Sequence, residues 1–265
     1  MTNEVTPETA KSRAWNAIFD RYEISEHDFD SGPFPITADQ IKVACQHFEK
    51  TGEKEPRILC KQDTRGSRPQ TFQDKGLFIL PVRNGRYIIV KGEGYVDIPT
   101  IQSPLLEYQS DLGFKLETTR VGNSEMQHLD SAYAFSLIRH FTEDNSLVLT
   151  IRGRKYTPQF SFYASGFHIT TRSVQTEVDG GYEGRSQVVL VEAKNTNATN
   201  TIIRQIYYPF RQWQEHTDKL VSTLFFQRTN ENEYHIWQFT FDDMNDYDSI
   251  RLTKSARYRI LFPRR

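Results

Sequence analysis

The sequence contains few cysteines, and its two, Cys45 and Cys60, form no CxxC pair and have no spacing typical of metal ligands. A disulfide scaffold and a zinc ribbon are therefore both disfavoured. The amino terminus has no apolar segment like that of a signal peptide, and no apolar run approaches the length that spans a membrane. These absences predict a soluble, cytoplasmic protein.

The sequence also lacks an excess of charge of either sign. Its 33 basic and 34 acidic residues give a formal net charge of −1. Because the whole chain would not attract nucleic acid, only local basic patches could do so. No Walker A, HExxH or GxSxG motif occurs, and the seven histidines are scattered. The sequence therefore disfavours a nucleotide loop, a histidine metal site and a histidine-based triad.

The first part of the 265-residue chain has the pattern of a small α+β region. Helical spacing predicts a helix over residues 8–22, and a second over 37–50, where Thr37 caps the helix and Gln40 is its third residue. Two strands, 76–82 and 85–92, follow around a turn at Asn84-Gly85. This order is typical of a winged helix-turn-helix module, and a generic α+β domain fits equally well. We expect residues 1–110 to recognise DNA.

Residues 111–265 predict a mixed sheet with helices on its faces, which is an α/β (α+β) architecture. Helices are expected around residues 125–144 and 201–216, the second with Pro209 as an internal break. Strands are expected in six further stretches, at 147–154, 159–165, 171–179, 187–193, 220–228 and 233–242, with a last strand at 257–262.

The strand Gln187–Ala193 is apolar on both faces but ends on charged residues. Glu192 and Lys194 lie two residues apart, so they share one face of the strand. The preceding strand is expected to end on Asp179, and a hairpin between the two strands would place Asp179 beside Glu192. Two carboxylates and an ammonium group at one sheet edge suit a Mg²⁺ site that binds a phosphate. A surface hairpin with an ordinary Glu/Lys pair is the alternative.

Asp179, twelve intervening residues and then Glu192-Ala193-Lys194 resemble the PD-(D/E)XK motif of restriction-endonuclease-like nucleases. The predicted order α-β-β-β-α-β over residues 126–228 resembles their core, although Val178 stands where the motif usually has proline. The resemblance implies that Asp179, Glu192 and the backbone carbonyl of Ala193 bind Mg²⁺. It also implies that Lys194 orients or activates the attacking water.

Further residues are candidates for supporting or DNA-binding roles. Glu177 and Glu183 are nearby acids, and Gln205 and Tyr208 lie three apart on the helix after the motif. Each also has an ordinary explanation, as a solvated side chain or, for Tyr208, as helix packing. Basic residues that could contact DNA or remain simply solvated lie in three groups: Arg57, Lys61, Arg65 and Arg68; Arg152, Arg154 and Lys155; Arg204 and Arg211.

The resemblance implies a Mg²⁺-dependent type II restriction endonuclease that hydrolyses double-stranded DNA to 5′-phosphate and 3′-hydroxyl ends. A palindromic site would require a homodimer, and a separate DNA methyltransferase would accompany the enzyme. Two alternatives stay open: a repair or recombination nuclease with the same core, and an inactive DNA-binding protein.

Overall fold

The structure is a computed structural model that describes residues 9–122, 124–195, 197–230 and 232–262. It divides into two compact units. The first contains the described residues up to Tyr95 together with Gln159–Val174, and the second contains Val96–Pro158 and the residues from Gln175 onward. The first boundary therefore lies between residues 95 and 96, and not at residue 110 as predicted. The segment Gln159–Val174, which was expected in the second part, belongs to the first unit.

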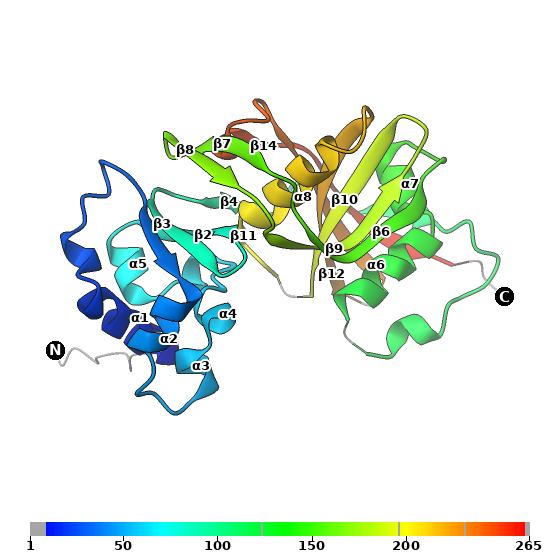
Figure 1. Ribbon diagram of the computed structural model, residues 1–265. Helices are drawn as coiled ribbons and strands as arrows, with labels where there is room; N and C mark the ends of the chain where they lie inside the picture. The colour runs from blue at the N-terminus through cyan, green and yellow to red at the C-terminus, as the bar shows by residue number, and fades with distance from the viewer. Residues whose placement is uncertain (1–8, 123, 196, 231, 263–265) are drawn as a thin grey trace. The chain divides into compact units, whose positions relative to one another are not determined.

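The first unit contains a three-stranded antiparallel sheet of order β1-β3-β2 and several short helices (Figure 1). The predicted capping box is present, because Thr37 and Gln40 exchange hydrogen bonds at the start of α2. That helix ends at Ala44, earlier than predicted. The elements are α1 (Ala10–Arg21), β1 (Phe34–Thr37), α2 (Ala38–Ala44), α3 (Thr51–Lys54), α4 (Pro56–Leu59), α5 (Gln70–Asp74), β2 (Leu77–Arg83), β3 (Arg86–Lys91), β7 (Phe160–Ala164) and β8 (Phe167–Thr171).

The hairpin β7–β8 joins the first unit through the end of β2. The carbonyl of Val82 accepts hydrogen bonds from Thr171 Oγ1 at 3.1 Å and from the backbone N–H of Arg172 at 3.0 Å. Strand β8 was not predicted from the sequence. Its contacts with β2 are long-range, so local patterning does not indicate them.

The second unit contains a seven-stranded mixed sheet of order β5-β14-β13-β12-β10-β9-β6. Strand β10 runs parallel to β12 and β5 runs parallel to β14, whereas the other neighbours are antiparallel. The elements are β4 (Tyr95–Asp97), which begins at the unit boundary, β5 (Leu106–Gln109), α6 (Glu125–Ala134), α7 (Leu137–Thr142), β6 (Val148–Tyr156), β9 (Gln175–Glu183), β10 (Gln187–Lys194), β11 (Asn200–Ile202), α8 (Arg204–Gln214), β12 (Leu220–Asn230), β13 (Glu233–Phe241) and β14 (Ile250–Leu261).

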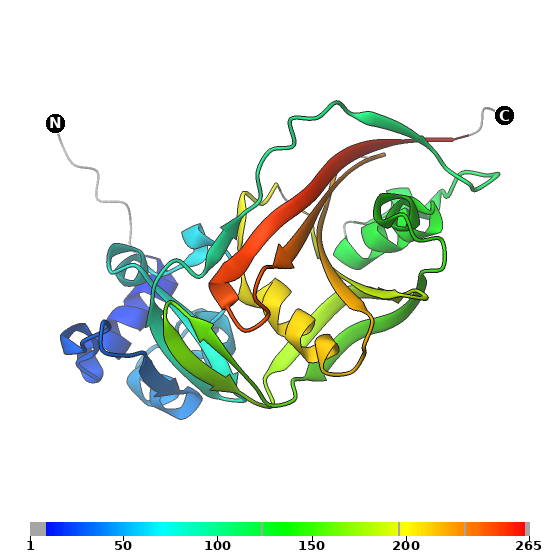
Figure 2. The ribbon, with the colours of Figure 1, turned by 90° about the horizontal axis from the view of Figure 1, so that it is seen from above.

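Helices cover both faces of this sheet, as predicted for a mixed α+β fold. Helices α6 and α7 pack on the face that carries Val189 and Val191, whereas α8 packs on the face that carries Val188 and Leu190 (Figure 2). Alternate residues of β10 therefore enter two different apolar clusters, which explains why this strand has no polar face.

Two predicted elements differ from the structure. The helix expected over 125–144 is two helices, because Ser136 adopts a left-handed conformation with φ 63° and interrupts the hydrogen-bonding pattern. Strand β9 does not end on Asp179 but continues through Gly180 and Gly181 to Glu183. A Cβ at either glycine would lie 2.6 Å from Leu129 or Ile151, so glycine permits this close packing.

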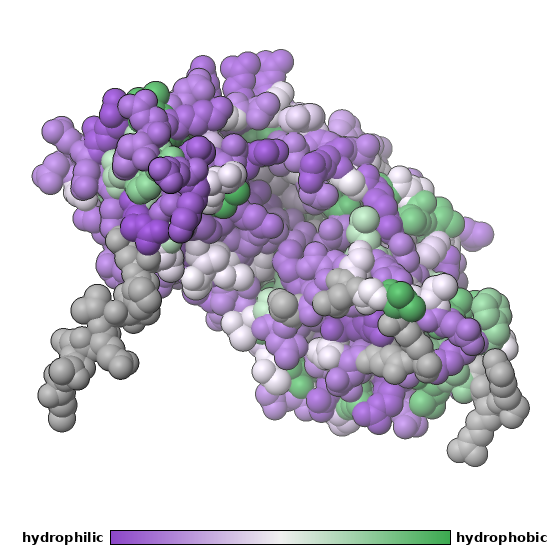
Figure 3. Space-filling view, turned by 90° about the horizontal axis from the view of Figure 1, so that it is seen from below, coloured by the Kyte–Doolittle hydropathy of each residue, from purple (hydrophilic) through white to green (hydrophobic). Residues whose placement is uncertain are grey.

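The surface is mostly polar in the view of Figure 3, where hydrophilic side chains predominate and apolar groups form small patches. None of the described helices is long and apolar enough to cross a membrane.

Candidate active site

Glu192 and Lys194 lie at the end of β10, on the face of the sheet that α8 covers. They continue the alternation of Val188 and Leu190, which pack in the cluster with Phe210 and Trp213 of α8. Nζ of Lys194 forms an ion pair with Oε1 of Glu192, and the two side chains are 20% and 10% exposed. The site is thus mostly enclosed, yet solvent still reaches both charged groups.

Asp179 of β9 is held against the backbone of β10. Its Oδ2 accepts a hydrogen bond of 2.8 Å from the N–H of Ala193, the residue between Glu192 and Lys194. The β9–β10 register ends one residue earlier, where Gly180 stands opposite Val191. The Asp179 side chain therefore accepts a hydrogen bond at a point where a backbone carbonyl would accept it in a regular ladder. This contact places Asp179 beside the Glu192-Ala193-Lys194 segment.

A further acid, Glu125, joins this group from the first turn of α6. Its Oε1 accepts a hydrogen bond of 3.2 Å from the N–H of Asn195, directly after Lys194. Its negative charge acts on both Asp179 and Lys194. Glu125 was not predicted from the sequence, because nothing in its local pattern separates it from any other acid at a helix start.

The charges of this cluster change the pKa values of Asp179 and Lys194 in the same direction. Burial raises the pKa of Asp179, and Glu125 and Glu177 add to this effect against the opposing influence of the Ala193 N–H and Lys194. Burial alone would lower the pKa of Lys194, but the contact with Glu192 and the charges of Glu125 and Asp179 outweigh it and raise that pKa. Lys194 is therefore an ammonium ion, and the acids around it outnumber the cations.

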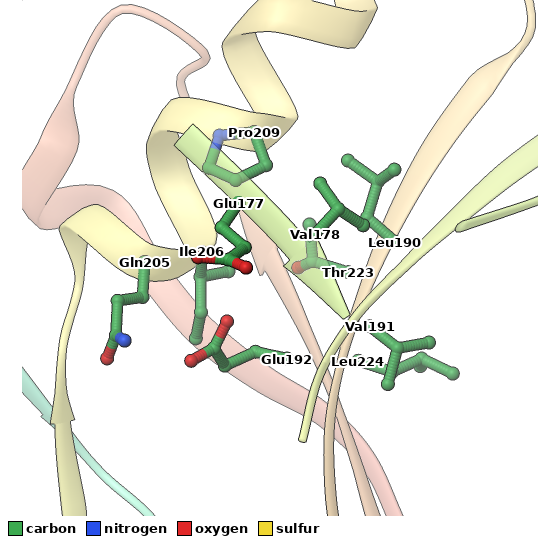
Figure 4. A pocket seen from close by; sticks show the side chains of 10 residues that line it. All are labelled: Glu177, Val178, Leu190, Val191, Glu192, Gln205, Ile206, Pro209, Thr223 and Leu224. Carbon is green, nitrogen blue, oxygen red and sulfur yellow. The ribbon is translucent and has the colours of Figure 1, made fainter. Parts of the chain in front are cut away.

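A pocket opens beside Glu192 under α8. In Figure 4, Glu177 of β9 and Glu192 of β10 point into the same space, next to Gln205 of α8. Gln205 Oε1 accepts a hydrogen bond from Thr201 Oγ1 at 2.9 Å, which fixes its amide. Gln205 and Glu177, both candidates for supporting roles, thus lie beside Glu192. The rest of the pocket is mainly apolar: Val178, Leu190, Val191, Ile206, Pro209, Thr223 and Leu224.

The two extra acids of the hairpin lie in different places. The register between β6 and β9 shifts, since Ile151 pairs with Gly181 but Gly153 pairs with Val178. Glu177 stands before this bulge, opposite Arg154, with which it forms an ion pair. Glu183 stands opposite Val188 at the other end of the hairpin and forms an ion pair with Lys219. Glu183 therefore lies away from the Glu192-Ala193-Lys194 segment, because β9 continues beyond Asp179.

Two residues of α8, Tyr208 as a supporting candidate and Arg211 as a DNA-contact candidate, are buried in packing. Tyr208 is 1% exposed, and burial raises the pKa of its phenol well above the ordinary value. Arg211 is 3% exposed and donates hydrogen bonds to the carbonyl of Met244 at 2.9 Å and to Tyr207 Oη at 3.1 Å. Neither side chain can reach DNA, because the apolar face of α8 turns both into the protein.

Replacing Arg211 should therefore affect stability and not DNA binding. We expect Arg211→Ala to reduce the free energy of unfolding by about 3 kcal/mol, because it leaves the Met244 carbonyl and Tyr207 without their buried charged donor. Denaturant unfolding measures this change. Arg251→Ala is the matched control, since Arg251 forms an exposed ion pair with Asp242 and should change stability by less than about 1 kcal/mol. Equal effects of the two variants would contradict the structural role.

The other basic residues that were assigned to DNA are mostly engaged within the protein. Arg65 forms an ion pair with Glu93, and Arg68 donates to the carbonyl of Leu77 at 3.2 Å and lies over the ring of Tyr95. Arg57 and Lys61 are exposed beside Glu55 and Asp63. Arg152 pairs with Asp130, Arg154 pairs with Glu177, Lys155 is exposed, and Arg204 is half-buried at the start of α8.

The raised pKa of Asp179 predicts that this carboxylate destabilises the fold. The folded state holds the proton more tightly than the unfolded state, so stability falls as the pH rises from about 4, the ordinary pKa of aspartate. Asp179→Asn removes the charge and keeps an oxygen that can accept from Ala193. We expect this variant to melt about 2–4 °C higher at pH 7, the shift that ~1 kcal/mol produces in a chain of this size.

Thermal unfolding from pH 4 to pH 8 measures this effect. The difference in Tm should shrink as the pH falls toward 4, where wild-type Asp179 becomes protonated. Glu177→Gln is the control, because that carboxylate is exposed and its replacement should leave Tm nearly unchanged. A lower Tm for Asp179→Asn than for wild type at pH 7 would contradict the prediction.

Comparison with known families covers almost the whole chain. Residues 90–259 match the family described as Domain of unknown function (DUF6997), which is more than half of the chain. The chain belongs to the DUF6997 family. Residues 12–89 match a second description, Domain of unknown function (DUF6996). Neither description names an activity, and no curated protein and no solved structure matches the chain. The candidate site lies entirely within the DUF6997 match.

Proposed function

We propose that this protein is a Mg²⁺-dependent endonuclease that cuts double-stranded DNA at a specific sequence, as type II restriction enzymes do. One observation carries the proposal. Asp179 of β9 is hydrogen-bonded to the backbone between Glu192 and Lys194 of β10, so the three groups of the PD-(D/E)XK pattern meet at one sheet edge. The pattern was identified from its residues, their spacing and the predicted elements around them, and the contact supports it independently.

The order of the elements around this site also supports the proposal. Helix α6 precedes β6, β9 and β10, and α8 and β12 follow, which is the order α-β-β-β-α-β of restriction-endonuclease-like nucleases. The four strands lie in the sheet order β6-β9-β10-β12, and β10 is parallel to β12. Three short insertions interrupt this order among the described residues: helix α7, the hairpin β7–β8 between β6 and β9, and strand β11 between β10 and α8.

The donor groups fit a magnesium ion. Among the described residues, no three His, Cys, Asp or Glu side chains lie close enough together to form a preformed metal site. Mg²⁺ does not require one, because it usually binds one or two carboxylates together with waters and substrate phosphate. The raised pKa of Asp179 supports a cation here, since positive charge would offset the cost of its burial beside Glu125 and Glu177.

We assign the metal ligands to Asp179, Glu192 and the carbonyl of Ala193. When bound, the ion would polarise the scissile phosphate and lower the pKa of a coordinated water. Glu192 would then exchange part of its contact with Lys194 for the metal, which releases the ammonium group toward the phosphate. Glu125 would keep the end of β10 in position through its hydrogen bond to the Asn195 N–H.

Lys194 acts as a cation in this proposal. Its raised pKa keeps it protonated at neutral pH, so it donates hydrogen bonds to the attacking water or to a phosphate oxygen and does not remove a proton. Water attacks phosphorus, its proton passes to solvent, and the bond to the 3′ oxygen breaks. The 3′ oxygen takes up a proton, and the products are a 5′-phosphate and a 3′-hydroxyl.

Incubation of purified protein with unmethylated phage DNA tests the function. In the presence of Mg²⁺ we expect discrete fragments whose ends can be ligated, and with EDTA we expect intact DNA. A smear of products would favour the repair or recombination nuclease over a restriction enzyme. Intact DNA on methylated, unmethylated and branched substrates would overturn the nuclease assignment and favour a binding protein. A homodimer and a companion methyltransferase are expected for a palindromic site.

A further inference from the structure

Two segments that contribute strands to the first unit contain no acidic residue. Residues 145–176, which include the hairpin β7–β8, have neither Asp nor Glu, although acids make up 34 of the 265 residues of the chain. About four acids would be expected in a stretch of that length. Residues 75–92, which form β2 and β3, also lack acids. These two segments are neighbours, because the end of β8 binds the carbonyl of Val82 in β2.

The hairpin β7–β8 has one buried face and one exposed polar face. Tyr163 stands opposite His168, and Ser161 opposite Thr170. Arg172 continues the alternation of His168 and Thr170 and is exposed beyond the end of β8. Tyr163 is 52% exposed. The other face anchors the hairpin through buried side chains: Phe160, Phe162, Ala164, Ile169 and Thr171.

Three arginines collect where this hairpin meets β2. Arg83 and Arg86 flank the Asn84-Gly85 turn between β2 and β3, and they pair with each other in the strand register. Arg172 is next to them, since its N–H donates to Val82. All three are exposed, and none forms an ion pair within the described residues. Other exposed arginines do form ion pairs, among them Arg57, Arg154 and Arg251.

We propose that the exposed face of β7–β8, together with Arg83, Arg86 and Arg172, binds duplex DNA along its phosphate backbone. Arginine forks suit phosphate oxygens, and unpaired arginines do not first have to break an ion pair. A two-stranded ribbon fits the major groove, where the hydroxyl, imidazole and phenol groups of this face meet base edges. The surface differs from the predicted loop at residues 57–68, whose arginines are engaged in ion pairs and carbonyl contacts.

The inference rests on the proposed function for the identity of the ligand as DNA. The surface itself argues against a membrane, because its exposed face carries polar groups and one tyrosine but no exposed aliphatic side chain to enter lipid. It also argues against an acidic peptide. The regularly spaced phosphates of a duplex match arginines on two separate hairpins. The carboxylates of a single flexible peptide do not match them in this way.

Equilibrium binding of the full chain to a fluorescein-labelled duplex tests the surface. All variants carry Asp179→Asn so that the duplex stays intact, and anisotropy is recorded at several salt concentrations. We expect Arg172→Ala and the double variant Arg83→Ala/Arg86→Ala each to weaken binding by about tenfold. The salt dependence should become shallower by about one unit for each lost phosphate contact. Arg251→Ala is the matched control, and equal affinity of all variants and the control would overturn the proposal.

Additional measurements separate a loss of DNA contacts from misfolding and from general binding to anionic surfaces. Circular dichroism and Tm should be the same for all variants, and Arg172→Glu should weaken binding more than Arg172→Ala because it repels phosphate. Vesicles that contain anionic lipid should bind much more weakly than the duplex. If the arginine variants reduce vesicle binding as much as duplex binding, the assignment to DNA is wrong.

The binding assay separates this inference from the proposed function. If DNA binding depends on the three arginines but wild-type protein with Mg²⁺ does not cleave DNA, the DNA-binding surface is supported and the proposed nuclease activity is overturned. Cleavage by wild-type protein, with arginine variants that bind and cut normally, would support the nuclease and overturn the surface.

Discussion

Asp179→Asn and Glu192→Gln should each reduce the single-turnover rate of DNA cleavage by roughly a thousandfold or more, equivalent to ~4 kcal/mol of activation free energy. Each replacement removes one negative charge from the two side chains that would hold Mg²⁺. A neutral amide oxygen is a weaker ligand for a hard cation than a carboxylate. Because Asp179→Asn keeps the acceptor for the Ala193 N–H, the loss of rate would not follow from a lost hydrogen bond.

Single-turnover cleavage with excess enzyme and a range of Mg²⁺ concentrations measures this effect. DNA binding in Ca²⁺ or without metal should survive, since recognition is expected to lie mostly outside this site. Glu183→Gln is a matched control on the same hairpin, because Glu183 lies at its opposite end and pairs with Lys219. If either site variant cut DNA at nearly the wild-type rate, the metal site would be assigned wrongly.

Lys194→Ala should also lose several orders of magnitude in cleavage, roughly a thousandfold, while the protein stays folded and binds DNA. Its ammonium group is held by Glu192 and kept charged by the neighbouring acids. Charge at this position stabilises the transition state, in which negative charge increases on the phosphate oxygens. Lys194→Arg should be poor as well, because a planar guanidinium does not replace a compact ammonium in an enclosed site.

The pair of Lys219 and Glu183 provides the control for Lys194. It joins the same region of the sheet at the other end of the hairpin, so Lys219→Ala removes a similar ion pair without touching the proposed site. We expect Lys219→Ala to cut normally. A Lys194→Ala rate within about tenfold of wild type, or only ~1.4 kcal/mol of barrier, would contradict the catalytic assignment.

Local features of the sequence determined a large part of the fold. The Thr37/Gln40 capping box, the Asn84-Gly85 turn and the apolar run before Glu192 each depend on residues a few positions apart, and all are present in the structure. The alternation that places Glu192 and Lys194 on one face is equally local. The spacing of Asp179, Glu192 and Lys194 therefore predicted which residues would meet, although not how.

Only the tertiary structure decided the contacts that depend on distant segments. Gly180 and Gly181 read as a turn in the sequence, but close packing against Leu129 and Ile151 keeps them within β9 and moves Glu183 away from the site. Helix α6 brings Glu125 to Asn195, seventy residues away along the chain. Arg211 was predicted to contact DNA, but it is buried and donates a hydrogen bond to the Met244 carbonyl. Charge and polarity are visible in the sequence, whereas burial and partners depend on which distant segments pack together.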